Sequence, residues 1–391
     1  MKNHKISSIA AAVALASISA AHAAEPVVAG DEAGTFKIPG SETSVGFYGY
    51  VHVDVIKDVN AGTKDWAYDA GSIGIKDDPS GVNADSREGK LNVTAQTSRF
   101  GIKSSTPTEI GKVRTVLEGD FVGSTFRLRH AYGDLSSSWG SLIAGQYWTL
   151  FRSGEAIPET VDFNGQGSVA SARKPQVRYT TTPGAAGSFA VGIEVPANPV
   201  SDAIVKAPAV TAAWVKGGDW GTVSVRGIAN QIAFETIPTT TTDSSSKTKY
   251  GFAGSIGGAF KLGQADTLQA LVTAGNGISQ YVAAANYNPE AVEGSEIKLT
   301  TVTAYTAGWQ HRWSTSVRTN LSYGHTRLGD QYLDAVGHAA NRTVDGGFAN
   351  VIWSPAKNTE FGFEFGHGQR KLSSGESGKF NRVQASFHYG F

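Results

Sequence analysis

The feature that most constrains the fold of this chain is an alternation of apolar and polar residues with a period of two, which recurs along most of the sequence. In the last segment, Val383, Ala385, Phe387, Tyr389 and Phe391 alternate with polar or small residues. Successive side chains of a β-strand point to opposite faces, so the pattern predicts a strand with one apolar face. A half-buried final strand of a soluble all-β protein has the same pattern, and this segment alone leaves that alternative open.

A final strand that ends on phenylalanine resembles the last strand of bacterial outer-membrane β-barrels, where that strand is the assembly signal. The resemblance implies that Phe387, Tyr389 and Phe391 form the signal here. It also implies that the barrel assembly machinery is a partner of this chain.

Residues 1–23 have the composition of a secretory signal peptide. Lys2 and Lys5 form a basic start, residues 6–20 are apolar but too short to span a bilayer, and Ala21-His22-Ala23 is a small-x-small cleavage site. We expect the mature chain to begin near Ala24. Cleavage removes two of 34 basic residues and leaves 32 against 34 acidic ones, so the charge gives no support for nucleic-acid binding.

The remaining composition favours strands and turns. The chain has 47 glycines and only 17% charged residues, and no run beyond the signal peptide approaches 18 apolar residues. There is no cysteine, which excludes a disulfide framework, and the histidines show neither an HExxH motif nor a compact ligand cluster. We therefore expect no catalytic residues, metal or cofactor.

We predict an all-β fold, a transmembrane antiparallel β-barrel of about sixteen strands. Residues 24–42 are a polar, glycine-containing stretch and are expected to form a periplasmic lead-in, followed by the barrel domain at 43–391. The expected strands are 43–57, 91–104, 112–122, 126–135, 141–149, 174–182, 188–196, 207–216, 220–232, 249–262, 265–275, 298–311, 314–328, 343–354, 358–370 and 379–391.

The connections between these strands alternate between short turns and long loops. The long loops include 58–90, 150–173, 197–206, 233–248, 276–297 and 329–342. Outer-membrane barrels have this arrangement and an even strand count, whereas a soluble sandwich has no reason to separate loop lengths. Two places resist the scheme: the connection 123–125 is short although it falls on the loop side, and the second strand changes parity between Ala95 and Phe100, which requires a bulge.

Tryptophans gather at the short turns. In a barrel these turns share one rim, so the indole rings would form a belt at the level of the lipid headgroups. Core tryptophans scattered through a soluble protein would not cluster at turns. The five residues are Trp139, Trp214, Trp220, Trp313 and Trp353.

Charged residues fall on the face of the strands that would line the lumen. We expect Asp120 to oppose Arg127, and Glu118 to oppose Arg129, across neighbouring antiparallel strands. Such pairs can simply stabilise the wall. The alternative is that arginines form a basic strip that binds carboxylates through their fork of donors. That strip would consist of Arg99, Arg114, Arg127, Arg129 and Arg178.

Loop 150–173 is the candidate constriction. Acidic groups on an inward-folded loop, opposite basic groups on the wall, would set a transverse field that orients and filters solutes. The alternative is a solvated surface loop. The loop carries Glu155, Glu159, Asp162 and Asn164, and it re-enters the wall at Arg173 and Lys174.

Several motifs along the mature chain resemble those of the DcaP-like porin family. They are Gly40–Tyr50, Ser98–Gly101, Glu118–Phe121, Arg127–Tyr132, Gly145–Trp148 and Asp162–Gly165. The resemblance implies a trimeric, sixteen-stranded porin that favours negatively charged solutes, with dicarboxylates as the type substrate. Some members carry an N-terminal coiled coil, for which residues 24–42 are too short.

The main hypothesis is therefore an outer-membrane porin, a passive channel for small anionic solutes, that sits in outer-membrane lipid as a homotrimer. An outer-membrane barrel with a phospholipase-like activity is an alternative, with His325 or His130 beside a serine. A receptor with a plugged lumen would need a globular segment before the first strand. A soluble, secreted all-β binding protein is a third possibility.

Overall fold

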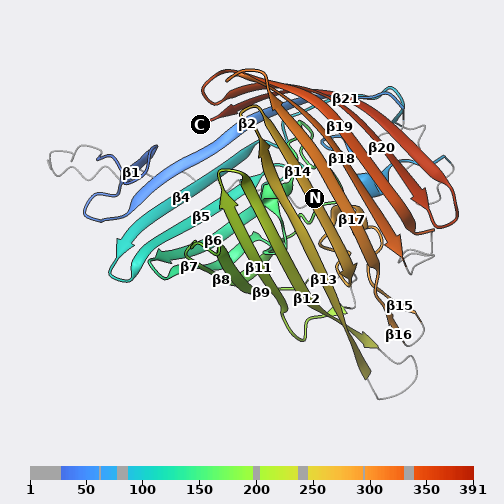
Figure 1. The fold of residues 1–391 in the computed structure, drawn as a ribbon, viewed down its shortest axis with the longest axis horizontal. Helices are drawn as coiled ribbons and strands as arrows, with labels where there is room; N and C mark the ends of the chain where they lie inside the picture. Colours follow the sequence, from blue (N-terminus) through green and yellow to red (C-terminus); the bar gives the residue numbers. More distant parts are fainter. Residues whose placement is uncertain are drawn as a thin grey trace, which may run out of the picture.

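The computed structural model describes residues 28–60, 63–76, 87–196, 203–236, 245–293, 296–329 and 339–391. Their strands form one antiparallel sheet that closes on itself as a sixteen-stranded barrel, as predicted (Figure 1). Each strand pairs with its neighbour in the chain, and β2 (Ser44–Asp58) pairs with β21 (Ser377–Gly390) to complete the ring. The predicted signal peptide, residues 1–23, lies outside the described residues.

Sixteen elements make up the wall, and their bounds agree with the predicted strands to within a few residues in most cases. Between β2 and β21 they are β4 (Arg99–Thr108), β5 (Gly111–Asp120), β6 (Arg127–Ser137), β7 (Gly140–Trp148), β8 (Arg173–Thr181), β9 (Ser188–Glu194), β11 (Ala209–Gly218), β12 (Gly221–Thr236), β13 (Ser245–Leu262), β14 (Asp266–Asn276), β17 (Thr301–Arg312), β18 (Val317–Gly329), β19 (Asn341–Ala356) and β20 (Thr359–Leu372).

Short elements that the sequence pattern did not predict lie beside the wall. They include three 3-10 turns, and no helix in the described part of the chain is long and apolar enough to cross a membrane. The added elements are β1 (Thr35–Lys37), β10 (Ala203–Ile204), a hairpin of β15 (Ala291–Glu293) and β16 (Glu296–Lys298), and the turns η1 (Ala70–Ser72), η3 (Gly154–Ala156) and η4 (Ala283–Ala285). A further short strand, β3 (Leu91–Thr94), is the first part of the predicted strand 91–104.

The burial pattern of the strands is inverted relative to a soluble protein. On β20 the rings of Phe361, Phe363 and Phe365 are 42–53% exposed, while Glu364 between them is 2% exposed. Apolar side chains outside and polar ones inside suit a wall whose outer face is covered by hydrocarbon. The pattern excludes the soluble all-β alternative, because a soluble barrel would bury those rings.

The parity change in the predicted strand 91–104 is an interruption and not the expected bulge. β3 and β4 both pair with β2, and the chain leaves the sheet between Thr94 and Arg99. The connection between β5 and β6 is short although it lies on the loop side, as the sequence indicated. It consists of six residues, 121–126.

One predicted register is wrong. Asp120 does pair with Arg127, but Glu118 pairs with His130 rather than Arg129. The cause is a β-bulge, which places one extra residue on β6 between Leu128 and His130. The side chain of Arg129 still reaches Glu118, with Nε donating to Oε1 at 3.2 Å.

Aromatic rings mark the rim that carries the short turns. Trp139 stacks on Tyr179 at 6.0 Å, and Trp353 stacks on Phe361 at 5.6 Å. Trp214 donates its indole N–H to the carbonyl of Ala186 at 2.7 Å. Rings that pack on the outer wall while their N–H groups find acceptors are typical of an interfacial belt.

The C-terminal phenylalanine lies on the seam that closes the ring. The backbone N–H of Phe391 donates to Gly49 O at 3.0 Å, and that of Gly49 donates to Phe391 O at 3.3 Å.

Deleting Phe391 should reduce the fraction of chain that reaches the folded barrel, because both hydrogen bonds are lost at about 1 kcal/mol each. Heat-modifiable gel mobility of outer-membrane fractions measures that fraction.

The control is Phe391→Tyr, which keeps the backbone pairing and the ring. Equal assembly of the deletion variant and the wild type would show that the last residue is not needed to close the seam.

Candidate functional site

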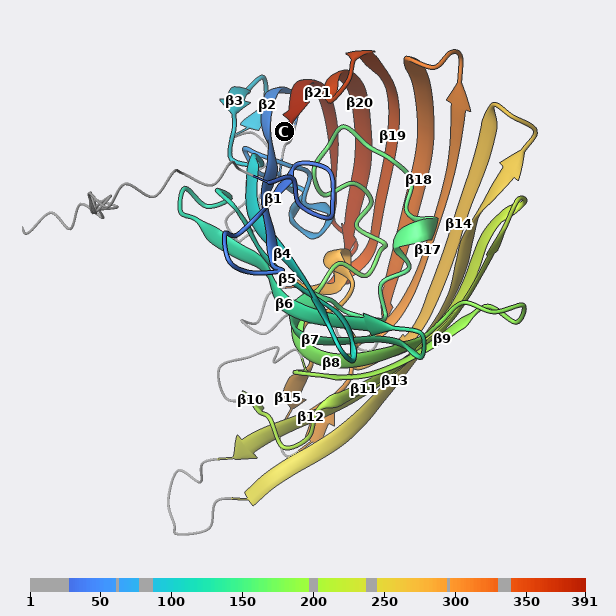
Figure 2. The ribbon, with the colours of Figure 1, turned by 90° about the vertical axis from the view of Figure 1, so that its left-hand side faces the viewer.

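The loop between β7 and β8, residues 149–172, folds into the barrel as predicted (Figure 2). It crosses the lumen and contacts the far wall at several points. The hydroxyl groups of Ser168 and of Thr306 on β17 lie 2.6 Å apart, and Ser171 N donates at 3.0 Å to Tyr281 O in the connection between β14 and β17. These contacts hold the loop against a wall strand and a second loop that are distant in the sequence, so it narrows the channel.

Two acidic residues of the loop are anchored by arginines of the far wall. Arg226 on β12 donates to both carboxylate oxygens of Glu155 at 3.0 and 3.1 Å. Burial opposes the ionisation of Glu155, but the charge of Arg226 holds its pKa below the usual value. Arg318 on β18 donates to both oxygens of Glu159 at 2.7 and 2.8 Å. Neither carboxylate is left as an unpaired charge on the loop.

The tip of the loop is held by carboxylates that accept backbone N–H groups. Glu364 accepts the N–H groups of Val161 and Asp162, both at 2.8 Å. The carboxylate of Asp162 is buried and accepts from the backbone of Tyr68 at 2.7 Å and of Asn164 at 2.9 Å. Burial raises the pKa of Asp162, against the opposing effect of Arg382. The Asn164 amide donates to Tyr68 O at 2.7 Å.

The four polar residues of the loop therefore contact groups that anchor the loop. The sequence pattern did not predict those partners, Arg226, Arg318, Glu364 and Arg382, because each lies on a strand more than 60 residues away. Their only signal in the sequence is a charged residue at a lumen-facing position of its strand.

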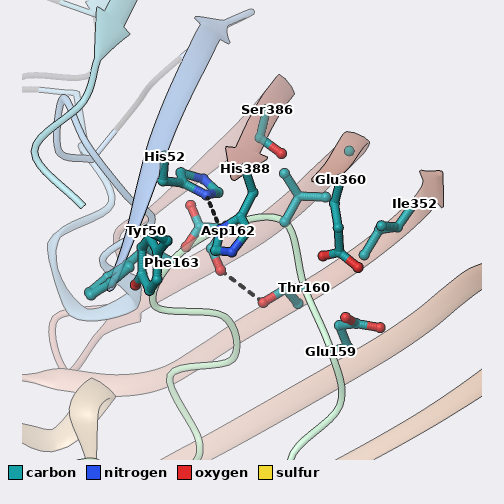
Figure 3. Close-up of a pocket in the computed structure, with 12 residues that line it drawn as sticks. Tyr50, His52, Glu159, Thr160, Asp162, Phe163, Ile352, Glu360, Ser386 and His388 are labelled. Carbon is teal, nitrogen blue, oxygen red and sulfur yellow. Dashed lines mark hydrogen bonds between the residues drawn. The ribbon is translucent and has the colours of Figure 1, made fainter. Parts of the chain in front are cut away.

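A cavity lies between the loop and the seam at which β2 pairs with β21. Figure 3 shows Glu159, Thr160 and Asp162 on the loop facing His52 and other residues of the wall. The cavity measures about 310 Å³. The imidazoles of His52 and His388 meet across the seam with their Nδ1 atoms 3.3 Å apart.

On the near wall, two carboxylates bind three of the predicted arginines. Arg127 holds Asp120 with two hydrogen bonds of 2.9 and 2.7 Å, and Arg129 reaches the same carboxylate at 2.7 Å. Arg99 lies 3.4 Å from Glu118 and covers the ring of Tyr50. Three cations and two carboxylates form one network, which keeps a single excess positive charge.

Next to this network lie guanidinium groups without carboxylate partners. Arg152 and Arg173 contact the Trp148 ring, with their central carbons 4.4 and 4.9 Å from its centroid. Arg178 lies 5.1 Å from the Tyr147 ring. Among the described residues none of the three arginines has an acidic oxygen within 4 Å, and the buried Nε atoms of Arg152 and Arg178 donate to no protein atom.

Nearby acids offset the electrostatic repulsion at this point only in part. Burial lowers the pKa of Arg152 and the charge of Glu155 raises it, while the charges of Arg226 and Arg129 lower it further. Lys174 adds a fourth cation over the ring of Tyr281 at 5.4 Å. Like charges held close together in a partly desolvated space lower the energy of an anion that enters it.

A cavity beside the loop brings Arg152 and Arg173 together with the arginines of the near-wall network. It measures about 780 Å³, and the side chains that line it include six basic and one acidic residue. The charged ones are Lys64, Asp69, Arg99, Arg127, Arg129, Arg152 and Arg173. The sequence pattern did not predict Arg152, although its place four residues after Trp148, at the start of the constriction loop, is a signal that could have found it.

Two predicted residues of the basic strip lie apart from this cavity. Arg114 is near the short-turn end of β5 and donates to Glu32 of the N-terminal segment at 2.8 Å. Arg178 lies on β8 under Tyr147 and does not line the cavity.

A closed sixteen-stranded barrel with an inward-folded loop defines an outer-membrane channel of the porin type. The chain belongs to the DcaP outer membrane protein family, whose model matches residues 30–391. The protein therefore resides in the outer membrane of a Gram-negative bacterium.

Solved structures agree with this assignment. The crystal structure of the outer membrane channel DcaP of Acinetobacter baumannii is 27% identical, covers 93% of this chain and 100% of its own, and has a TM-score of 0.77. An anion-selective porin from Comamonas acidovorans (13% identity, 90% and 100% coverage, TM-score 0.58) and OmpT of Vibrio cholerae (12%, 90% and 99%, 0.58) share the fold. No curated protein matches the chain in sequence.

Loss of the carboxylate that holds the loop tip should destabilise the constriction. In Glu364→Ala two buried N–H groups lose their acceptor, at a cost of about 1–3 kcal/mol each. We expect larger open-channel noise and a larger conductance in planar-bilayer recordings. Glu364→Gln keeps one acceptor oxygen and should lie between the two, and unchanged noise in the alanine variant would contradict the anchoring role.

Proposed function

We propose that the chain forms a water-filled diffusion channel that favours small anionic solutes such as dicarboxylates. The observation that carries this proposal is the pair of guanidinium groups, Arg152 and Arg173, that contact Trp148 without a carboxylate partner. Their forks of donors suit carboxylates. A solute with two carboxylates can contact both arginines as it passes the constriction loop.

The distribution of acids supports the same preference. Glu155 and Glu159 are neutralised by Arg226 and Arg318, so they add little negative potential to the passage. The channel is then best described by a basic surface beside the loop rather than by a balanced field across it. One similar structure is described as an anion-selective porin, which agrees with this reading.

A homotrimer is part of the proposal. A row of short side chains crosses the outer face of four neighbouring strands, where other strands carry phenylalanine, leucine or valine. Such a flat face permits close contact with a second copy, and one similar structure is described as a trimer form. The row is Ser104, Thr115, Gly133 and Ala144, which pair directly in the sheet.

An enzymatic barrel is less well supported. His325 contacts Asp345 at 2.7 Å and stacks on Tyr305, and His130 packs on Tyr147. No hydrogen bond joins either histidine to a serine within the described residues, so a phospholipase-like nucleophile has no activating base. The family and the similar structures are channels and porins.

Removal of the unpaired arginines should reduce anion selectivity more than removal of a paired one. In Arg152→Ala/Arg173→Ala we expect the chloride-to-potassium permeability ratio to fall by about fivefold, since losing the two charges together changes the energy of an anion in the passage by on the order of 1 kcal/mol. Reversal potentials in a KCl gradient and succinate uptake by liposomes measure the effect. Cation selectivity of the wild-type channel would overturn the proposed function.

Arg127→Ala is the matched control, because it also removes one guanidinium but leaves Arg129 on Asp120. Its permeability ratio should change less than that of either single variant, Arg152→Ala or Arg173→Ala. An equal or larger change would place the selectivity in the paired network.

A bulky residue in the flat row should prevent trimer formation. A Cβ atom at Gly133 would meet nothing closer than Arg114 O at 3.8 Å within its own chain, so Gly133→Trp should be compatible with the barrel fold. We expect native mass spectrometry in detergent to change from trimer to monomer. Ala349→Trp, on the outer face of β19, is the control and should stay trimeric, whereas a trimeric Gly133→Trp would exclude this face.

A further inference from the structure

The N-terminal segment forms a small hairpin at the short-turn end of the barrel. In this lead-in hairpin, residues 28–37, Lys37 N donates to Val28 O at 2.9 Å and Gly30 N donates to Thr35 O at 2.9 Å. Its second arm is β1, which pairs with the first residues of β2, from Ser44 to Gly46. The hairpin thereby covers the part of β2 that extends beyond the C-terminal residue.

The turn of the hairpin lies over the lumenal face of β2. Ser44 and Gly46 share that face with Tyr48, and the Ser44 hydroxyl accepts from Asp31 N at 3.0 Å. A Cβ atom on Gly46 would lie 2.8 Å from Thr35 Cγ2 and 3.0 Å from Gly34 O. Only glycine permits this approach, so the turn is placed inside the mouth rather than outside it.

Glu32, in that turn, meets three cations of the wall. Arg114 Nη2 and Lys112 Nζ donate to Oε1 at 2.8 and 3.2 Å, and Lys103 Nζ lies 3.6 Å from Oε2. The hydrogen bond from Lys112, together with the charges of Arg114 and Lys103, lowers the pKa of Glu32. The carboxylate is therefore ionised at neutral pH.

Among the described residues, no second acid contacts the three cations as Glu32 does. Asp134 lies opposite Arg114 in the sheet, but its carboxylate accepts hydrogen bonds from Ser136 and Ser141 at 3.2 and 2.5 Å. All three cationic side chains are about one-third to one-half exposed, so solutes in the mouth can reach them. Without Glu32 the cluster would present three positive charges to the lumen.

We propose that Glu32 is a specificity-determining residue that acts as a tethered carboxylate, occupying a second anion site formed by Lys103, Lys112 and Arg114. The inference rests on the proposed preference for anionic solutes. It adds that a carboxylate of the chain itself fills the site at the short-turn end. A solute carboxylate that leaves the constriction then meets cations that are already paired with Glu32. It therefore leaves the channel without binding a second time.

Neutralising Glu32 should open this site. In Glu32→Gln we expect the chloride-to-potassium permeability ratio to rise by about twofold at 0.1 M KCl, where screening is weak enough for the cluster to act. Succinate added at the short-turn side should block the chloride current of the variant at lower concentration than in the wild type. Heat-modifiable gel mobility confirms that both proteins are folded.

Asp31→Asn is the matched control, because it removes the same charge one residue away, where Asp31 contacts Lys37 at 3.8 Å rather than the cluster. It should leave the ratio and the succinate block unchanged. In a Lys112→Gln/Arg114→Gln background, Glu32→Gln should have little further effect. Equal ratios for Glu32→Gln and Asp31→Asn would overturn the inference.

The outcome separates this inference from the proposed function. A wild-type channel that prefers cations contradicts the proposed function, whatever the variants do. A wild-type channel that prefers anions, with no response to Glu32→Gln, contradicts only the tethered carboxylate.

Discussion

The structure depends on one constraint: inside a bilayer, each backbone N–H and C=O group must be paired within the protein. A sheet satisfies it only when its two edges meet, and here they meet where β2 pairs with β21. Along this edge β2 has two successive partners, β21 along most of its length and β1 at its start. Closure of the ring thus fixes the position of the N-terminal segment as well as that of the last residue.

Once the ring is closed, the polar face becomes a confined space, and its charges must be balanced inside it. The chain uses its acids for structure: Glu155 and Glu159 secure the loop, and Asp120 secures the bulged part of the wall. Arg152 and Arg173, beside Trp148, have no carboxylate oxygen within 4 Å in the described part of the chain. The contacts that anchor the loop therefore also determine which charges remain unpaired beside it.

Much of the fold follows from the sequence, because the period of two is a local property of each strand. Alternation in sixteen segments, of which β20 is one example, predicts the wall, and the length and charges of the loop after Trp148 predict a constriction. Contacts across the lumen are different. The pairing of Glu159 with Arg318 joins residues 159 positions apart, and periodicity carries no information about which lumenal groups meet. The bulge at Arg129 was not predicted either, because inserting one residue leaves the charge pattern on both sides intact.

The hydrogen bonds that hold the loop tip have a consequence for which side chains the loop can carry. Glu364 and Asp162 hold mainly backbone N–H groups, which every residue except proline supplies. The side chain of Phe163, which lines the cavities on both sides of the loop, can therefore be exchanged while these hydrogen bonds are retained. The path of the constriction is thus held by backbone groups and does not depend on the side chain that faces the passage at this position.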